Sequence, residues 1–143
     1  MPTRRPMDHI GKNKFKIEIN GVTVAAFTAV EGIEARTAVI TYVDGNDMIV
    51  RKRPGRTTYS NIIFKRGYVN TDELWQWYKA VMDGQAERRS GSIIVLDEAG
   101  DEIFRYNFFE AWPCRWKSLE LDAAAPGALI EELEVVVEKI ERG

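Results

Sequence analysis

The sequence has few of the residues that form most catalytic and metal sites. Its 143 residues include one histidine, His9, and one cysteine, Cys114. Ser-His-Asp triads, Cys-His pairs and most zinc sites are therefore excluded. A single cysteine also leaves no intrachain disulfide, so we expect the protein to be made in the cytoplasm, a reducing compartment.

Several longer patterns are missing as well. No apolar run approaches the ~20 residues of a membrane helix. The N-terminal MPTRRPMDHI has no apolar segment of a signal peptide, so we expect no membrane anchor. There is no glycine-rich nucleotide motif and no C-x-x-C, and residues 44–47 lack the closing glutamate of a calcium loop. We therefore expect no enzyme, no cofactor and no metal.

Composition predicts a soluble globular protein with an uneven distribution of charge. The chain is 45% hydrophobic and 29% charged, and its length predicts one domain over residues 1–143, with residues 1–13 as a flexible arm. Residues 1–90 carry 15 Lys and Arg against 10 Asp and Glu, whereas residues 91–143 carry 5 against 12. This split favours self-association, because the positive part of one copy can meet the negative part of another. The alternative is that the charges lie on solvated faces and cancel over the whole surface.

The first half of the chain predicts strands. Residues 15–19 alternate apolar and polar side chains, and Asn20-Gly21 before Val22-Thr23-Val24 predicts a hairpin. Further strands are expected at about residues 33–43 and 57–65. Between them, Pro54-Gly55 is interpreted as a turn, because proline fixes φ and glycine allows positive φ.

One helix is predicted over about residues 71–83. Asn70 can cap it, Glu73 can complete a capping box, and Gly84 can end it. Six apolar side chains form one broad stripe. Aromatic residues at this spacing indicate packing against a sheet rather than a stacking platform for bases or sugars, and the stripe gives the expected core residues Trp75, Tyr78 and Val81.

The second half predicts strands again. Residues 92–96 and 102–112 flank a turn, and in the longer strand Phe104, Tyr106 and Phe108 face one side while Ile103 and Phe109 face the other. A strand apolar on both faces is covered on both, by a helix, a second sheet or another subunit. We place Phe104 and Phe108 in the core. In IEELEVVVEKIE, alternating Leu133, Val135 and Val137 favour a strand over a helix. The fold class is mainly β with one amphipathic helix.

A basic cluster surrounds Pro54-Gly55 and consists of Arg51, Lys52, Arg53 and Arg56. It could hold a phosphate, bind nucleic acid, or dock on an acidic protein surface. A small β-barrel module for single-stranded nucleic acid would also combine basic and aromatic residues. Here the aromatic residues occupy mainly core spacings, and the chain as a whole is not basic.

Four motifs in order carry a resemblance. They are Arg51-Lys-x-Pro-Gly55, Lys65-Arg66-Gly67, Leu74-Trp75-x-Trp77-Tyr78 and Asn107-x-x-x-Ala111-Trp112-Pro113. With their flanks, over about residues 15–140, they resemble the tail tube family of contractile phages and phage-like injection particles. No role is carried onto Cys114.

The resemblance implies a fold and a function. It implies an antiparallel β-barrel or sandwich with the helix on its side, and six-membered rings whose strands join around a channel. The rings stack into an inner tube, which a contracting sheath drives through a target envelope so that DNA or a protein can pass. The implied partners are copies of the chain, a sheath protein, baseplate or tube-initiator proteins, and cargo, within a virion tail or injection particle. A tube-initiator or baseplate paralogue of this fold is the alternative.

The resemblance also implies a role for the basic cluster. The hairpin that holds it would project from the barrel to a neighbouring subunit or ring. We therefore expect an interface formed by Arg51, Lys52, Arg53, Pro54, Gly55 and Arg56. Their acidic partners on the next copy would be drawn from Glu120, Asp122, Glu131, Glu132 and Glu134, with Glu131 and Glu132 first.

Overall fold

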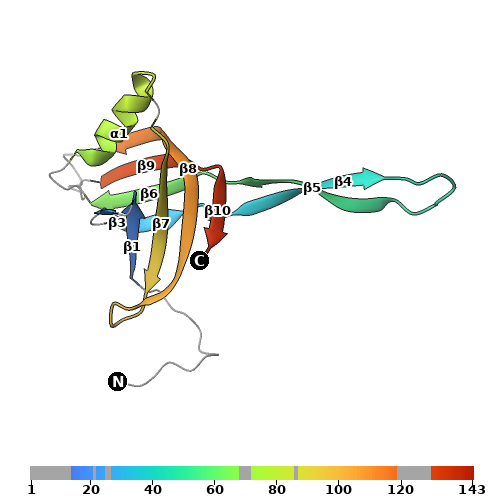
Figure 1. Ribbon diagram of the computed structural model, residues 1–143, viewed down its shortest axis with the longest axis horizontal. Helices are drawn as coiled ribbons and strands as arrows, with labels where there is room; N and C mark the ends of the chain where they lie inside the picture. The colour runs from blue at the N-terminus through green and yellow to red at the C-terminus, as the bar shows by residue number, and fades with distance from the viewer. Residues whose placement is uncertain (1–13, 21, 25–26, 68–71, 86, 119–129) are drawn as a thin grey trace, which may run out of the picture.

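The computed structural model describes residues 14–20, 22–24, 27–67, 72–85, 87–118 and 130–143. The expected N-terminal arm, Asn70, Glu120 and Asp122 lie outside these ranges. Within them the chain is mainly β with one helix, which confirms the fold class (Figure 1). The elements are β1 Phe15–Ile19, β2 Val22–Val24, β3 Phe27–Glu31, β4 Ala35–Tyr42, β5 Arg51–Tyr59, β6 Ile62–Gly67, α1 Glu73–Met82, β7 Arg89–Leu96, β8 Glu102–Ser118, β9 Ile130–Val136 and β10 Lys139–Arg142.

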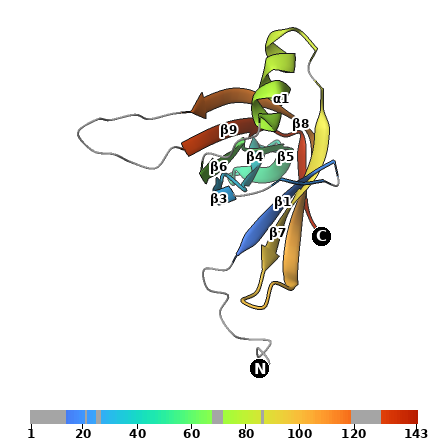
Figure 2. The ribbon, with the colours of Figure 1, turned by 90° about the vertical axis from the view of Figure 1, so that its left-hand side faces the viewer.

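The strands form one large curved sheet and one separate hairpin. The large sheet has the order β2-β1-β7-β8-β9-β6-β3, with β10 beside β8, and β4 pairs only with β5 in the described residues. Every pairing is antiparallel. The sheet curls without closing, because neither β2 nor β3 has a second partner strand in the described residues. Figure 2 shows α1 at one end of the body, beside β8.

Alternation along the strands builds the core. On β9, Leu133 and Val135 are buried while their neighbours are half-buried, and on β6 Ile62 and Phe64 are buried in the same way. The C-terminal run is thus a strand, as predicted. The helix contributes Leu74 and Trp77 to the core. The core cluster comprises Ile17, Ile19, Ile62, Phe64, Leu74, Trp77, Ile93, Phe108, Ala111, Leu133, Val135 and Val137.

The helix begins later than expected. Its N-cap is Asp72, which makes no side-chain capping hydrogen bond, and Glu73 is the first helical residue. A capping box with Glu73 at the third position is therefore wrong. The Glu73 carboxylate instead accepts a hydrogen bond from Arg66. Gly84 does end the helix: it has φ +79° and its N–H donates to the Val81 carbonyl.

The hairpin predicted at Asn20-Gly21 is confirmed. Ile19 pairs with Val22 across the two-residue connection, and Asn20 has φ +53°, as such tight turns require. The turn predicted at Pro54-Gly55 is wrong: both residues lie inside β5, and Pro54 pairs with Val39 beside a register shift. Proline has no N–H to donate to the neighbouring strand. It is tolerated there because the register shift already interrupts the regular hydrogen bonding between β4 and β5.

The chain actually reverses between β4 and β5 at residues 43–50. The Asp47 N–H donates to the Asp44 carbonyl, and Gly45 has φ +48°. The strand expected at residues 57–65 is divided, because β5 ends at Tyr59 and β6 begins at Ile62. The C-terminal run likewise divides into β9 and β10.

Strand β8 is longer than predicted and serves two parts of the sheet. Its first part pairs with β7 and β10, and residues 112–118 pair with β9. The bend contains Glu110 at φ +53° and a register shift between Pro113 and Arg115. Gly91 faces Phe108 at the bend, where a Cβ atom would overlap the Phe108 ring. Glycine is therefore required for β7 and β8 to approach there.

Candidate assembly interface

Strands β4 and β5 form a hairpin that projects far from the body of the protein (Figure 1). We call residues 35–59 the projecting hairpin. Every residue of β4 is exposed, and β5 is exposed except at Gly55 and Tyr59, which are half-buried. A two-stranded ribbon has no core and is marginally stable alone. The projecting hairpin therefore presents both of its faces to any partner.

The junction between the body and the hairpin is held by backbone contacts. The Ser60 hydroxyl donates to the Gly32 carbonyl, and the Ser60 N–H donates to the Glu34 carbonyl at 3.0 Å. Gly32 has φ +96°, and a Cβ atom at this position would overlap the Asn61 carbonyl oxygen. Only glycine fits both conditions. The junction thus fixes the direction in which the hairpin leaves β3 and β6.

The projecting hairpin is rich in exposed apolar side chains. Met48 at the tip is 98% exposed and Val39 on β4 is 66% exposed. Exposed apolar residues gathered on one segment mark an interaction surface, whereas scattered ones carry no such meaning. Sequence reasoning missed this feature, because an apolar residue beside a turn gives no sign of exposure. The set is Val39, Ile40, Tyr42, Val43, Met48, Ile49 and Val50.

The basic cluster lies on the projecting hairpin, within strand β5 rather than around the turn that the sequence analysis expected at Pro54-Gly55. Arg51 forms an ion pair with Asp47 at 2.8 Å, and its hydrogen bond lowers the pKa of the Asp47 carboxyl. Lys52, Arg53 and Arg56 have no ion pair within the described residues. The hairpin therefore carries three cations whose counter-charges are not supplied by the described part of its own chain.

The acids first expected to meet this cluster have partners in their own subunit. Glu131 is buried, lies 3.3 Å from the guanidinium of Arg66, and accepts a hydrogen bond from the Trp116 indole at 3.2 Å. Removing it from these contacts would leave a buried charge without a partner. Glu131 is therefore not free for another copy, which corrects the expectation.

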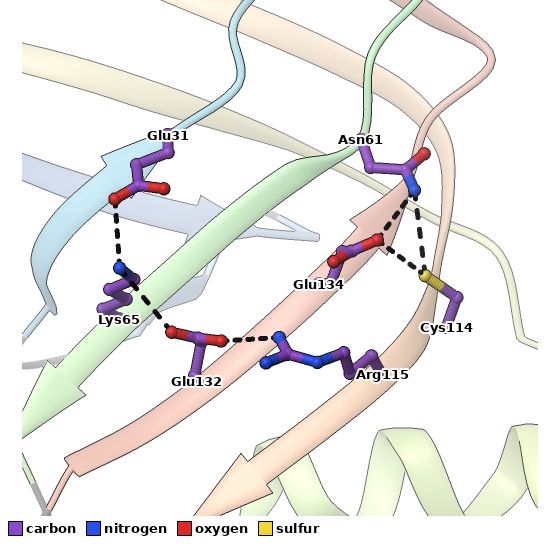
Figure 3. Close-up of polar contacts among 7 residues, drawn as sticks. All are labelled: Glu31, Asn61, Lys65, Cys114, Arg115, Glu132 and Glu134. Carbon is purple, nitrogen blue, oxygen red and sulfur yellow. Dashed lines mark hydrogen bonds and ion pairs between the residues drawn. The ribbon is translucent and has the colours of Figure 1, made fainter.

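Glu132 is paired in the same way, on the opposite face of β9. Its carboxylate lies between Lys65 on β6 at 3.6 Å and Arg115 on β8 at 2.5 Å, and Lys65 also reaches Glu31 on β3 at 3.0 Å (Figure 3). The Arg115 hydrogen bond lowers the pKa of Glu132, and Glu31 raises the pKa of Lys65. These alternating charges neutralise one another across four strands.

Cys114 lies beside this row of alternating charges. Its thiol is 3.6 Å from a Glu134 carboxylate oxygen, which also accepts a hydrogen bond from the Asn61 amide at 2.9 Å (Figure 3). Burial, followed by the charge of Glu134, raises the pKa of the Cys114 thiol. The thiol is thus held in its protonated, less nucleophilic form at neutral pH.

The residues expected in the core divide into two groups. Phe108 is fully buried, whereas Trp75, Tyr78, Val81 and Phe104 are half-buried. The Trp75 ring packs against Trp116 of β8 at 4.7 Å between centroids. The neighbouring helix residues Leu74 and Trp77 take the fully buried positions. The indole N–H of Trp77 donates to the Glu87 carbonyl at 2.9 Å.

The described residues contain no group of three or more His, Cys, Asp or Glu side chains placed to hold a metal ion. In the same residues, no helix is long and apolar enough to cross a membrane.

The fold is that of the tube proteins of contractile injection systems. A chain of the PVC extracellular sheath–tube complex matches with a TM-score of 0.87 at 21% identity, over 96% of this chain and 93% of that one. A chain of the anti-feeding prophage tube-terminating cap matches with 0.85 at 21% identity, over 100% and 94%. Hcp1 from Flavobacterium johnsoniae matches with 0.56 at 18% identity, over 90% and 94%. A search of curated proteins gives no match.

The sequence comparison gives the family. The pattern of the T4-like virus tail tube protein gp19 family matches residues 11–141. The chain belongs to this tail tube family, which confirms the resemblance carried by the four motifs.

Proposed function

We propose that this protein is the inner tube subunit of a contractile tail or injection particle. Six copies form a ring, rings stack into a hollow tube, and DNA or protein cargo passes through it. Membership of the tail tube family is the observation that carries the proposal. The proposed role of the protein is structural, and neither tube assembly nor cargo passage requires catalysis.

Two open sheet edges support ring formation. Strand β3 pairs only with β6, and residues 112–118 of β8 pair only with β9, within the described residues. These are the two ends of the strand series β8-β9-β6-β3. Because neighbours in this series are antiparallel, β3 and β8 run in opposite directions. Placed side by side in adjacent copies, they would continue the antiparallel sheet around a ring and satisfy their free backbone groups.

The projecting hairpin supports contact beyond the body of each subunit. It carries exposed apolar side chains, and cations without ion pairs in the described residues, away from the body of the subunit (Figure 1). The interface proposed here retains Arg51, Lys52, Arg53, Pro54, Gly55 and Arg56, without Glu131 and Glu132. We assign a sheath protein, baseplate or tube-initiator proteins, and cargo as further partners, within a virion tail or injection particle.

A tube-initiator or baseplate paralogue is the second candidate. A chain of the anti-feeding prophage baseplate matches this fold with a TM-score of 0.79 at 16% identity. The nucleic-acid module is not retained, because Trp77 is buried and Trp75 packs against Trp116, which leaves no stacking platform on the helix.

Negative-stain microscopy of the purified protein tests this function. We expect rings or long rods at low salt, formed either spontaneously or once baseplate is added as a template. Single rings that never elongate would identify the initiator paralogue, and monomers alone in the presence of template would contradict assembly.

A matched pair of variants extends the experiment. Met48→Ser/Ile49→Ser removes exposed apolar surface from the hairpin tip and should abolish rods. Met82→Ser, at an exposed methionine on α1, should leave them unchanged.

A further inference from the structure

Charged side chains share one face of the strand series β3-β6-β9-β8. Residues that pair in register lie on the same face of a sheet, and β6, β9 and β8 place charged residues opposite one another in this way. Leu133 and Val135, which alternate with the charged residues of β9, belong to the core. The charges therefore lie on the opposite face, which we call the charged face. In the described residues it carries as many acids as bases: Glu31, Glu132, Glu134, Lys65, Arg115 and Lys117.

The outermost charges on this face differ in sign at the two free edges of the sheet. Within the described residues, β3 pairs only with β6, and residues 112–118 of β8 pair only with β9. The Glu31 side chain is 55% exposed and the Arg115 side chain is 44% exposed. Lys117, two residues further along β8, is exposed as well. The edge of β3 therefore presents an acid, and the edge of β8 presents two bases.

A free antiparallel edge can pair with a second copy of itself. Pairing β3 with β3, or β8 with β8, would place neighbouring copies in opposite orientations, which a ring built from one repeated contact does not allow. In the first case Glu31 would meet an edge whose charged face has no base. In the second case Arg115 and Lys117 would meet the same two bases. Like charges across a strand pair are destabilising, whereas pairing β3 with β8 brings an acid to a base.

The two edges are complementary in more than one register. A shift of one residue would turn every side chain to the other face, so the allowed registers differ by two residues. Arg115 and Lys117 are themselves two residues apart, and each allowed register keeps a base near Glu31. On the core face, both edges carry partly buried apolar side chains packed against the core, among them Val30 on β3 and Trp116 on β8. The edges of β3 and β8 therefore match on both faces.

We propose that Glu31, with Arg115 and Lys117, selects β3 of one copy to pair with β8 of the next and excludes the pairing of like edges. This inference rests on the proposed function and deepens it, because it names the charges that give the ring contact its direction. Lys65 lies behind Glu31, and Glu132 lies behind Arg115 (Figure 3). The row therefore continues from copy to copy with alternating signs and no net charge.

Charge reversal at the two edges tests this selection. Glu31→Lys makes both edges basic, and Arg115→Glu/Lys117→Glu makes both edges acidic. The three positions are exposed, and Lys65 and Glu132 remain paired with each other. Far-UV circular dichroism and thermal melting should therefore match the wild type. Alone, each variant brings like charges together at every contact, and we expect at least a tenfold loss of rings and rods at low salt.

An equal mixture of the two variants should restore assembly. Each basic edge can then meet an acidic edge, and because the proposed ring has an even number of copies, the variants can alternate around it. We expect rings and rods within about threefold of the wild-type amount. Glu141→Lys is the matched control, since Glu141 is an exposed glutamate paired with a lysine, on β10 and outside both edges. It should assemble alone and should not restore the acidic variant.

Chemical cross-linking tests the exclusion of like edges without changing a charge. Ala29 lies on β3, in register with Lys65 of the charged face. Cys114→Ser removes the single cysteine, and Ala29→Cys then places one thiol on the edge of β3. A short bismaleimide should leave this protein free of cross-linked dimers while it assembles. A cross-linked dimer would show that two β3 edges meet, and would overturn the exclusion.

The outcomes separate this selection from the proposed function. Normal assembly of either charge-reversed variant alone, loss of assembly in the control, or no restoration by a mixture of variants that melt like the wild type overturns the selection and leaves the tube function standing. If a reversed variant melts at a lower temperature, the cross-linking result decides. Failure of the wild type to form rings or rods on its template overturns the function, and the selection with it.

Discussion

Arg66 on β6 and Glu131 on β9 form a buried ion pair, with 3.3 Å between the guanidinium and the carboxylate. Arg66 also donates to Glu73 at the start of α1, at 2.6 Å, and Glu131 accepts from Trp116 on β8. Two strands, the helix and a third strand therefore meet at one pair of charges. This explains why Glu131 belongs to the fold of its own subunit rather than to an interface.

Breaking this pair should destabilise the monomer strongly. Arg66→Met and Glu131→Gln should each cost about 3–5 kcal/mol, because each leaves a buried charge without its partner. The double variant should cost less than the sum of the two. Urea unfolding measures all three variants. Lys65→Met, on the half-exposed side of the same strand, should cost clearly less than Arg66→Met, because exposed ion pairs contribute little. Equal small losses at Arg66 and Lys65 would contradict a structural role for the pair.

The helix should depend more on Trp77 than on Tyr78. Trp77 is fully buried and donates a hydrogen bond to Glu87, whereas Tyr78 is half-buried. Trp77→Ala should cost about 3–5 kcal/mol, the usual range for a buried aromatic residue, and Tyr78→Ala clearly less. Thermal melting of the two variants compares them directly. A larger loss for Tyr78→Ala would mean that the helix packs by a different face.

Glu132 should contribute a pH-dependent part of the stability. Its pKa is lowered in the folded state, mainly by the Arg115 hydrogen bond, so the folded protein favours the ionised form. The contribution is complete above the pKa of the unfolded chain, near the ordinary glutamate value, and is lost as pH falls through the lower folded value. Glu132→Gln should therefore reduce stability at pH 7, and by progressively less as the pH falls below the ordinary glutamate pKa, as urea unfolding over this pH range would show. An unchanged difference between wild type and variant would rule out this linkage.

Cys114 should react slowly. Burial raises the pKa of its thiol, and the nearby Glu134 carboxylate adds to the effect, so less thiolate is present at any given pH. Iodoacetamide should alkylate the native protein more slowly at pH 8 than the same protein in urea. Glu134→Gln should increase the native rate modestly, because burial remains. A native rate equal to the unfolded rate would show that the site is open.

The elements with a strong local signal could be predicted from the sequence. The hairpin at Asn20-Gly21, the helix ending at Gly84 and the alternating strand through Leu133 and Val135 each depend on a few neighbouring residues. The exact helix start could not be predicted, because Glu73 is drawn to Arg66 rather than to a cap. Pro54-Gly55 was misread because proline and glycine mark both turns and irregular strand positions, and only the pairing with Val39 distinguishes them.

The sequence by itself determined the mainly β class, the single helix and, through four ordered motifs, the tail tube family. Tertiary structure decided which charged side chains form ion pairs within the chain and which stay exposed without one in the described residues. Glu131 and the exposed acids of the turn between β7 and β8 all carry carboxylates. An ion pair nevertheless forms only where chain folding brings opposite charges within a few ångströms. The same holds for exposure: Ile49 and Ile94 are both isoleucines, yet one lies on a projecting hairpin and the other is fully buried. Burial depends on what the rest of the chain places around a residue, and a local pattern does not contain that information.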